Sequence, residues 1–248
     1  MKVDETKCVG CGRCVSYCTM GAIGFTKDPY GRVCADVNQE ECVDCGVCYR
    51  AEICTGKALY EPLPVWPRSV RGTFSNPLIE HKETRVPGRG TEEMKTNDVT
   101  GRFKYGEAGM AIEMGRPSTG AFFRDIEKVA MAIASLGDIH FEQKNPITTL
   151  MVDRNSGRMN PELMNEKVLS AIIEMTVPLE RVQEIIGVVK KVTKEISTVC
   201  SFDLTCKVHP GDKTPAFDLA RGAGVAPTPN GKTNVGLGKP FFVEEAMR

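Results

Sequence analysis

The feature that most constrains this chain is the crowding of its cysteines. Nine of its eleven cysteines lie within the first 54 of 248 residues. Eight of them form two runs, "CVGCGRCVSYC" from Cys8 to Cys18 and "CVDCGVCYRAEIC" from Cys42 to Cys54. The first run reads C-x2-C-x2-C-x3-C and the second C-x2-C-x2-C-x5-C. Zinc sites usually separate two C-x2-C pairs by a longer loop, whereas thiolates at this spacing suit iron–sulfur clusters.

The rest of the composition favours a protein without a membrane span. The first residues, "MKVDETKC", have no apolar signal-peptide core, and no apolar run approaches the roughly 18 residues of a membrane span. We therefore expect a cytoplasmic protein, in which clustered cysteines favour metal over disulfides. The formal net charge is zero, so nothing points to nucleic acid as a partner.

The two runs resemble those of bacterial two-cluster ferredoxins. In that family the fourth cysteine of each run binds the other cluster. The resemblance implies one [4Fe–4S] cluster on Cys8, Cys11, Cys14 and Cys54, and a second on Cys42, Cys45, Cys48 and Cys18. This chain departs from the family pattern at the position after each fourth cysteine, because Thr19 and Thr55 replace the usual proline. It also has a longer spacer, "YRAEI", before Cys54.

The position of Cys18 suggests how crossed binding could arise. Cys14 and Cys18 are four residues apart, so a short helix would carry both on one face and present one thiolate to each cluster. Cys34 lies in "RVCADV", which alternates like a strand and favours a buried, inert thiol. Cys200 and Cys206 lie six apart in a predicted strand, where we also favour ordinary thiols over metal ligands.

After residue 60 the pattern changes. Residues 61–103 hold the proline-rich "YEPLPVWPRSVRG", which we interpret as an extended connector anchored by Trp66. Residues 104–210 alternate predicted strands and helices, with strands in "GMAIEMG", "DIHFEQ", "SAIIEMTVP" and "TVCSFDLTCKV". "TTLMVD" is a further short apolar run, and "MNPELMNEKVL" predicts a short helix. Residues 211–248 are predicted to form an extended arm.

Two long amphipathic helices are predicted within residues 104–210. They cover "GAFFRDIEKVAMAIASLG" and "LERVQEIIGVVKKVTKEIS", and similar strands, "AIEMGRP" and "IIEMTVP", precede them. Two such tandem units predict a ferredoxin-like split βαβ sandwich, so the whole chain is predicted to be α+β. That architecture by itself implies no iron.

Two polar segments are candidate contact regions. Loop 88–102 would meet a partner or an anion through Arg89, Lys95, Asn97, Asp98 and Arg102, or would be an ordinary solvated loop. The glycine-rich tail 222–240 would be ordered against another chain. The candidate acids and bases for catalysis are His81, His140 and His209, and their spacing forms no recognisable pair.

A second resemblance covers most of residues 1 to 210. The stretches "GRGTEEMKTNDVTGR", "AIEMGRP", "RDIEKV" and "NPITTLMVD" are similar to the iron–sulfur portion of 6-hydroxynicotinate reductase and related ferredoxin-dependent proteins. This resemblance implies low-potential reduction of a stabilised ring or conjugated substrate, in anaerobic metabolism.

These patterns favour an iron–sulfur electron-transfer subunit of an oxidoreductase. It would work in a hetero-complex with an electron carrier and a catalytic subunit, on which a flavin could be bound. One alternative is a self-contained reductase whose α+β region holds the substrate or a flavin. Another is a redox or ligand sensor. A further alternative is that the clusters only stabilise the fold.

Overall fold

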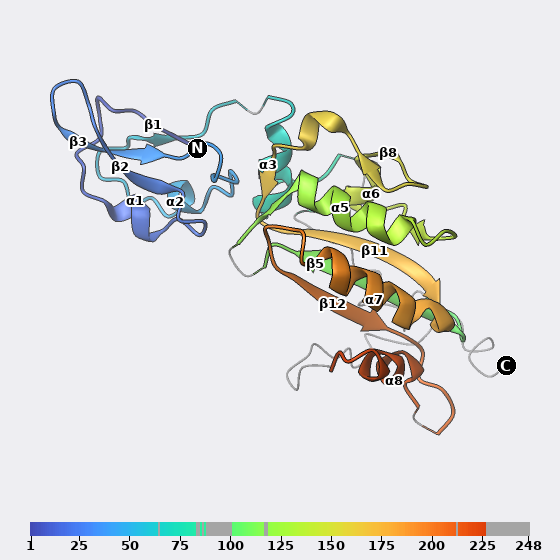
Figure 1. Cartoon of the computed structure of the whole chain (residues 1–248). Helices are drawn as coiled ribbons and strands as arrows, with labels where there is room; N and C mark the ends of the chain where they lie inside the picture. The colour runs from blue at the N-terminus through green and yellow to red at the C-terminus, as the bar shows by residue number, and fades with distance from the viewer. Residues whose placement is uncertain are drawn as a thin grey trace.

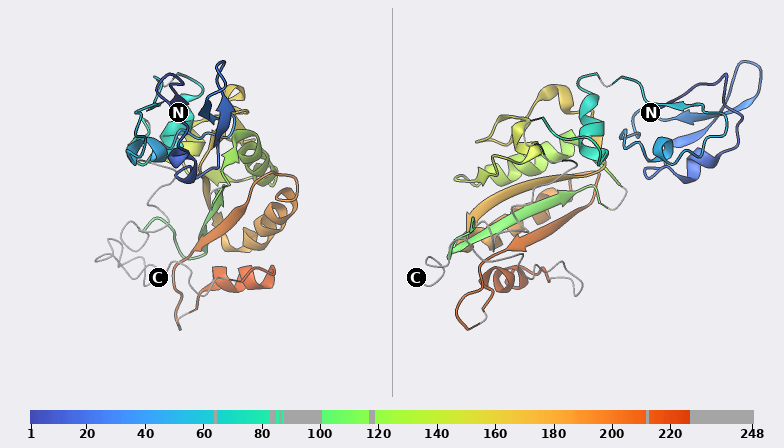
Figure 2. Two further views of the ribbon diagram at one scale, coloured as in Figure 1. Left: turned by 90° about the vertical axis from the view of Figure 1, so that its left-hand side faces the viewer. Right: turned by 180° about the vertical axis from the view of Figure 1, so that it is seen from behind.

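The computed structural model describes residues 1–63, 65–82, 85, 87, 101–116, 119–211 and 213–226. The buried apolar side chains form two separate cores, one from residues up to Leu59 and one from Val70 onwards. We call residues 1–60 the cysteine-rich body and the described residues 69–226 the sheet body. Figures 1 and 2 show the cysteine-rich body beside one end of the sheet body, next to helix α3 (Ser69–Ser75).

The cysteine-rich body consists of two small antiparallel ladders and two single-turn helices. Its elements are β1 (Lys2–Val3), α1 (Arg13–Ser16), β2 (Ile23–Lys27), β3 (Val33–Val37), α2 (Val47–Arg50) and β4 (Leu59–Tyr60). β1 pairs with β4, which brings the two ends of this body together, and β2 pairs with β3 in a hairpin. Most of its chain is loop, and the cysteines lie in or beside these loops.

Glycines make the tight entry into both single-turn helices. Gly12 precedes α1 with φ 73° and Gly46 precedes α2 with φ 70°, which is the left-handed region that other residues rarely adopt. A Cβ on Gly12 would also lie 2.8 Å from the ring of Phe25. The chain can therefore turn closely around Cys11 and Cys45 only because these positions have no side chain.

The sheet body is built on one antiparallel sheet. Its strands are β5 (Glu107–Met114), β7 (His140–Phe141), β11 (Ala171–Pro178) and β12 (Cys200–Thr205), in the spatial order β12-β5-β11-β7. Helices α5 (Phe123–Ala134) and α7 (Val182–Val192) cover one face of this sheet (Figure 1). The prediction that the chain mixes helices and strands is confirmed.

Shorter elements complete the sheet body. They are β6 (Ala121–Phe122), α6 (Pro146–Thr149), β8 (Met151–Asp153), β9 (Arg158–Met159), η2 (Pro161–Leu163), β10 (Lys167–Val168), η3 (Leu179–Arg181) and α8 (Pro215–Gly222). β6 pairs with β10, and β8 pairs with β9. The predicted short helix in "MNPELMNEKVL" is wrong, because only three residues form a 3-10 turn and the chain then extends into β10.

The helical periodicity in the sequence predicted the larger core well. Ile126, Val129 and Ile133 on α5 are fully buried, as are Ile185 and Ile186 on α7. The two similar strand sequences form the centre of the sheet, where β5 and β11 pair along their whole length. Side chains of both strands therefore face the helices at every second position.

The prediction of an extended connector is wrong for Ser69–Ser75, which forms α3. Pro67 precedes this helix and Pro77 follows it, so neither proline interrupts a helical hydrogen bond. Val70 and Phe74 are four residues apart, so both lie on one helical face and pack into the larger core. Trp66 does act as an anchor, because its indole N–H donates to Glu162 over 2.8 Å.

The prediction of an extended arm from residue 211 is also wrong in its first part. Pro215–Gly222 forms α8, with Pro215 in the first turn, where proline is well tolerated. Ala216 and Ala220 are four residues apart and buried, so α8 docks one face on the sheet body. The rest of the predicted arm, from residue 227, lies outside the described residues.

Candidate functional site

The first cysteine set lies at the loop between β1 and α1. Cys8 and Cys11 are in this loop, Cys14 is on α1, and Cys54 follows α2 along the chain. Burial raises the pKa of the Cys14 thiol, and the neighbouring charges of Cys8, Cys11 and Cys54 raise it further. Cys54 is thus close to the first run in space although it is 40 residues away from Cys14 in sequence.

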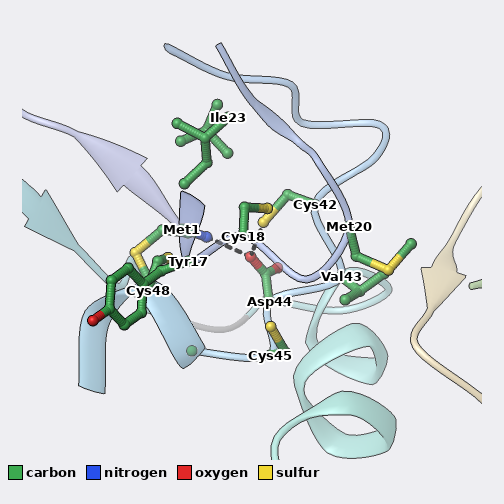
Figure 3. A pocket seen from close by; sticks show the side chains of 12 residues that line it. Met1, Tyr17, Cys18, Met20, Ile23, Cys42, Val43, Asp44, Cys45 and Cys48 are labelled. Carbon is green, nitrogen blue, oxygen red and sulfur yellow. Dashed lines mark hydrogen bonds and ion pairs between the residues drawn. The ribbon is translucent and has the colours of Figure 1, made fainter. Parts of the chain in front are cut away.

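The second set surrounds a cavity. Cys18, Cys42, Cys45 and Cys48 all line it, in a space of about 330 Å³ that includes its open mouth (Figure 3). Burial raises the pKa of Cys48 to about 12, with further contributions from Cys45, Cys18 and Cys42. Cys18 therefore lies with the second run rather than with its own.

The helix that was expected to carry both Cys14 and Cys18 is shorter than predicted. α1 ends at Ser16, and Cys18 lies beyond its C-cap residue Tyr17. A backbone hydrogen bond of 3.2 Å from Cys18 to Val15 still continues the turn. Cys14 is therefore on the helix and Cys18 lies just after its end, so the two thiols do not share one helical face as predicted.

Backbone amides point at several of the sulfurs. The amide of Ala22 donates to Cys18 Sγ over 3.1 Å, and the amide of Ala58 donates to Cys54 Sγ over 3.2 Å. In both cases the donor follows its cysteine by four residues, so the two halves of the body repeat the same turn. A third amide, from Ala35, lies 3.3 Å from Cys8 Sγ. Hydrogen bonds of this kind to ligand sulfurs tune the potential of a bound cluster.

Thr19, which replaces the usual proline after Cys18, has a specific contact. Its hydroxyl lies 3.6 Å from Cys45 Sγ, a cysteine of the second run. A proline could not make this contact. The departure from the family pattern therefore changes the polar surroundings of a sulfur and removes no thiol.

The arrangement of the thiols fits a cluster. Among the described residues, no three Cys, His, Asp or Glu side chains lie close enough together to hold one metal ion. A [4Fe–4S] cubane is bound at four separate irons, so its ligands enclose a volume instead of meeting at one point. Four thiols around a cavity, with apolar Met20, Ile23 and Val37 beside them, match that requirement.

Asp44 is a charged residue of this region that no sequence pattern indicated. It lies between Cys42 and Cys45, and it accepts a hydrogen bond from Cys42 Sγ over 3.3 Å. Burial alone would raise the pKa of Asp44, but the amino group of Met1 and the guanidinium of Arg68 outweigh burial and lower it. Asp44 is thus held as a carboxylate at the wall of the cavity.

Arg71 was also missed, because it falls in the segment that we had interpreted as a connector. It is 4% exposed and donates hydrogen bonds to both bodies. A proline-rich stretch followed by a seven-residue helix gave no local signal of a buried cation.

The remaining three cysteines are Cys34, which lies next to Cys8, and Cys200 and Cys206 in the sheet body. Cys34 is fully buried in β3, as predicted, and burial raises its pKa. Cys200 and Cys206 are partly buried and both pack on the larger core, although β12 ends at Thr205 and Cys206 lies just outside it. Burial raises the pKa of both thiols.

The histidines lie in different surroundings. His81 is buried against Phe74, His140 is on the short strand β7, and the ring of His209 lies 5.0 Å from that of Tyr105. Most of the predicted contact loop 88–102 lies outside the described residues, including Arg89, Lys95, Asn97 and Asp98. Arg102 is described, and it forms an ion pair with Glu142.

No helix in the part of the chain that the structure describes is long and apolar enough to cross a bilayer.

Comparison with known proteins agrees with the cysteine pattern. A family model described as a 4Fe-4S binding domain matches residues 1–24. An uncharacterized ferredoxin of Methanocaldococcus jannaschii is 36% identical over 55 residues, which cover 22% of this chain and 62% of that protein. Ferredoxin-3 of Rhodobacter capsulatus is 34% identical over 70 residues, which cover 20% of this chain and 69% of that protein. No solved structure matches.

The match to the family model lies in the N-terminal part of the chain. This chain spans less than two thirds of the first relative's length. The iron–sulfur and electron-transfer character of the N-terminal part follows from both comparisons. Through its cysteine-rich N-terminal segment, the chain belongs to the ferredoxin family.

Proposed function

We propose that the cysteine-rich body holds two [4Fe–4S] clusters with crossed ligands. Cys8, Cys11, Cys14 and Cys54 would bind one, and Cys42, Cys45, Cys48 and Cys18 the other. The observation that carries this proposal is the cavity lined by Cys18 together with Cys42, Cys45 and Cys48. When bound, such clusters supply one-electron redox chemistry. The chain supplies the thiolates, the amides that point at them and the apolar wall that limits water.

We further propose that the chain is the electron-transfer subunit of an oxidoreductase, working in the cytoplasm with a carrier and a catalytic partner. The first cysteine set supports entry of electrons, because Cys11 is exposed and Val9 and Phe25 beside it are 67% and 55% exposed. The cationic side chains of Arg13 and Lys27 lie at this surface and are also exposed. A carrier with an acidic docking face would match them.

The sheet body would then dock the catalytic partner. We propose that residues 104–210 are a split βαβ sandwich, which the antiparallel order β12-β5-β11-β7 and the two helices on one face support. The proposed domain boundary at residue 60 is kept, but α3 and α8 pack on the same core as residues 104–210 and so extend this body in both directions. The proposed chemistry is reduction of the 6-hydroxynicotinate reductase type, and a flavin would be on the partner.

Iron analysis with reciprocal variants tests the cluster proposal. After anaerobic reconstitution we expect roughly eight irons per chain, four for each cluster. Cys18→Ala should disturb the signal of the second cluster and spare the first, and Cys54→Ala should do the reverse. Separate electron paramagnetic resonance signals would follow the two clusters. Loss of the first cluster in Cys18→Ala, or a full content of only about four irons, would contradict crossed binding.

An anaerobic pull-down of the full chain tests the partner. We expect a stoichiometric catalytic subunit to copurify. A solitary chain that itself carries flavin would instead place the chemistry in the sheet body and would overturn the subunit proposal.

A further inference from the structure

One buried arginine joins the second cysteine set to the sheet body. Arg71 on α3 is 4% exposed, and its Nη1 group donates to three backbone carbonyls. These belong to Gln39 at 2.9 Å, Glu40 at 3.0 Å and Cys42 at 2.9 Å. The guanidinium thus binds the backbone of the segment that leads into Cys42, and one of its hydrogen bonds is to the carbonyl of Cys42 itself.

The opposite side of the same guanidinium binds the sheet body. Its Nε forms an ion pair with Glu166, and its Nη2 donates to the carbonyl of Asn165 over 3.2 Å. Next to it, Lys167 on β10 forms an ion pair with Glu41 from the cysteine-rich body. The planar fork of arginine suits this task, because its five N–H groups can serve two segments at once.

The chemistry of this contact points to a role beyond packing. A buried cation is costly unless its hydrogen bonds are made, and here they are made by a ligand-bearing segment on one side and a carboxylate on the other. The Arg71 guanidinium lies between the segment 39–42 and Glu166. It is therefore closer to Cys42 than the Glu166 carboxylate is. Net charge and local hydrogen bonds set the potential of a thiolate-bound cluster.

The first cysteine set has no comparable contact. The described hydrogen bonds and ion pairs that link the cysteine-rich body to the sheet body join Arg71 to the segment 39–42, Lys167 to Glu41, and Arg50 to Asn76. Among the described residues, none of these bonds reaches Cys8, Cys11, Cys14 or Cys54. The second set is therefore the one held against the sheet body.

We propose that Arg71 is a positioning residue that sets the reduction potential of the second cluster alone and holds it as the cluster that exchanges electrons on the sheet-body side. This inference rests on the proposed crossed binding of two clusters. Arg71 would raise the potential of the second cluster by stabilising its more negative, reduced form. Glu166 would oppose this effect, because its carboxylate partly cancels the cation.

Redox titration of the full, reconstituted chain tests the inference, with the two cluster signals followed separately. Arg71→Met should shift the second cluster to lower potential, and Glu166→Gln should shift it to higher potential. Neither change should move the first cluster. Arg71→Lys should give a smaller shift than Arg71→Met, because it keeps the charge but loses the fork. As a matched control, Arg13→Met removes an exposed cation next to Cys14 and should leave the second cluster unchanged.

Hydrogen exchange gives a readout of position that does not depend on potential. The amides of residues 39–42 should exchange faster in Arg71→Met and in Arg71→Lys than in the parent chain. Unchanged exchange in this segment would contradict the positioning role.

The outcomes separate the inference from the proposed function. Shifts of equal size at both clusters, shifts of the same sign in Arg71→Met and Glu166→Gln, or no shift would each overturn the role of Arg71. If Arg71→Met fails to assemble the second cluster, Glu166→Gln decides alone, and an unmoved or lowered potential overturns the inference. A parent chain with a single cluster would instead show that the proposed function is wrong, before any variant is measured.

Discussion

The two bodies of this chain bury their interiors in different ways. The core of the cysteine-rich body has nine buried residues, and three of them are the cysteines Cys14, Cys42 and Cys48. The core of the sheet body has thirty buried residues and no cysteine among them. A body of about 60 residues is marginal on hydrophobic burial alone. We therefore expect the smaller body to depend on bound iron–sulfur cofactor and the larger one on packing.

This contrast also explains where polar contacts are found. The cysteine-rich body directs amides and a hydroxyl at its sulfurs, as would suit thiolates that bind a cluster in a small interior. The sheet body has aliphatic side chains from α5 and α7 against one sheet face. Arg71, between the two, satisfies carbonyls of the first and a carboxylate of the second.

Removal of the iron should give the largest difference between the two bodies. Chelation should abolish the protection of amides in residues 1–60, because metal binding and folding are coupled in small metal-binding domains. Residues 104–210 should keep their protection. Hydrogen exchange followed by mass spectrometry measures both in one sample. Equal loss of protection in the two bodies would contradict the separation that we describe.

A substitution that creates a cavity in the larger core should destabilise the sheet body and leave the cysteine-rich body intact. Ile126 on α5 is fully buried, and Ile126→Ala should lower the free energy of unfolding of the sheet body by about 2–5 kcal/mol. Iron content should stay unchanged. The matched control is Met131→Ala on the same helix, which is 39% exposed and should cost about 0.5 kcal/mol or less. Urea unfolding gives both values, and an iron loss in Ile126→Ala would show that the two cores are not independent.

The anchor between the bodies should contribute less. Trp66→Phe keeps an aromatic ring but removes the N–H that donates to Glu162. We expect a loss of about 0.5–1.5 kcal/mol in the free energy of unfolding. A double-mutant cycle with Glu162→Ala, which removes the acceptor, isolates the pair. A coupling energy of zero would mean that the contact does not join the two bodies.

The smallest effect should come from the thiols of the sheet body at high pH. Burial raises the pKa of Cys200 and of Cys206 above the ordinary value of 9.0. A raised pKa in the folded state stabilises the fold below the unfolded pKa, and this contribution is lost as pH rises through the folded pKa. The free energy of unfolding should therefore fall above about pH 9. A Cys200→Ala, Cys206→Ala double variant should show a weaker decline, and an unchanged slope would contradict burial of the thiols.

Local sequence patterns predicted the regular parts of the fold. The stripes of Ile and Val residues placed α5 and α7, and the similar strands "AIEM" and "IIEM" became the paired centre of the sheet. The predictions failed where a short segment was decided by its neighbours. Ser69–Ser75 is helical because Val70 and Phe74 find a core beneath them, which the prolines before it gave no means to foresee.

The sequence by itself determined the two cysteine runs, the glycines that let the chain turn around them and the periodicity of the larger core. All of these act over a few residues, so spacing is enough to read them. The resemblance to ferredoxins already implied that Cys18 belongs with the second run, but only the tertiary structure showed the cavity that they share and brought Arg71 to Glu166, 95 residues along the chain. Such contacts depend on how two folded bodies meet, and no local spacing contains that information.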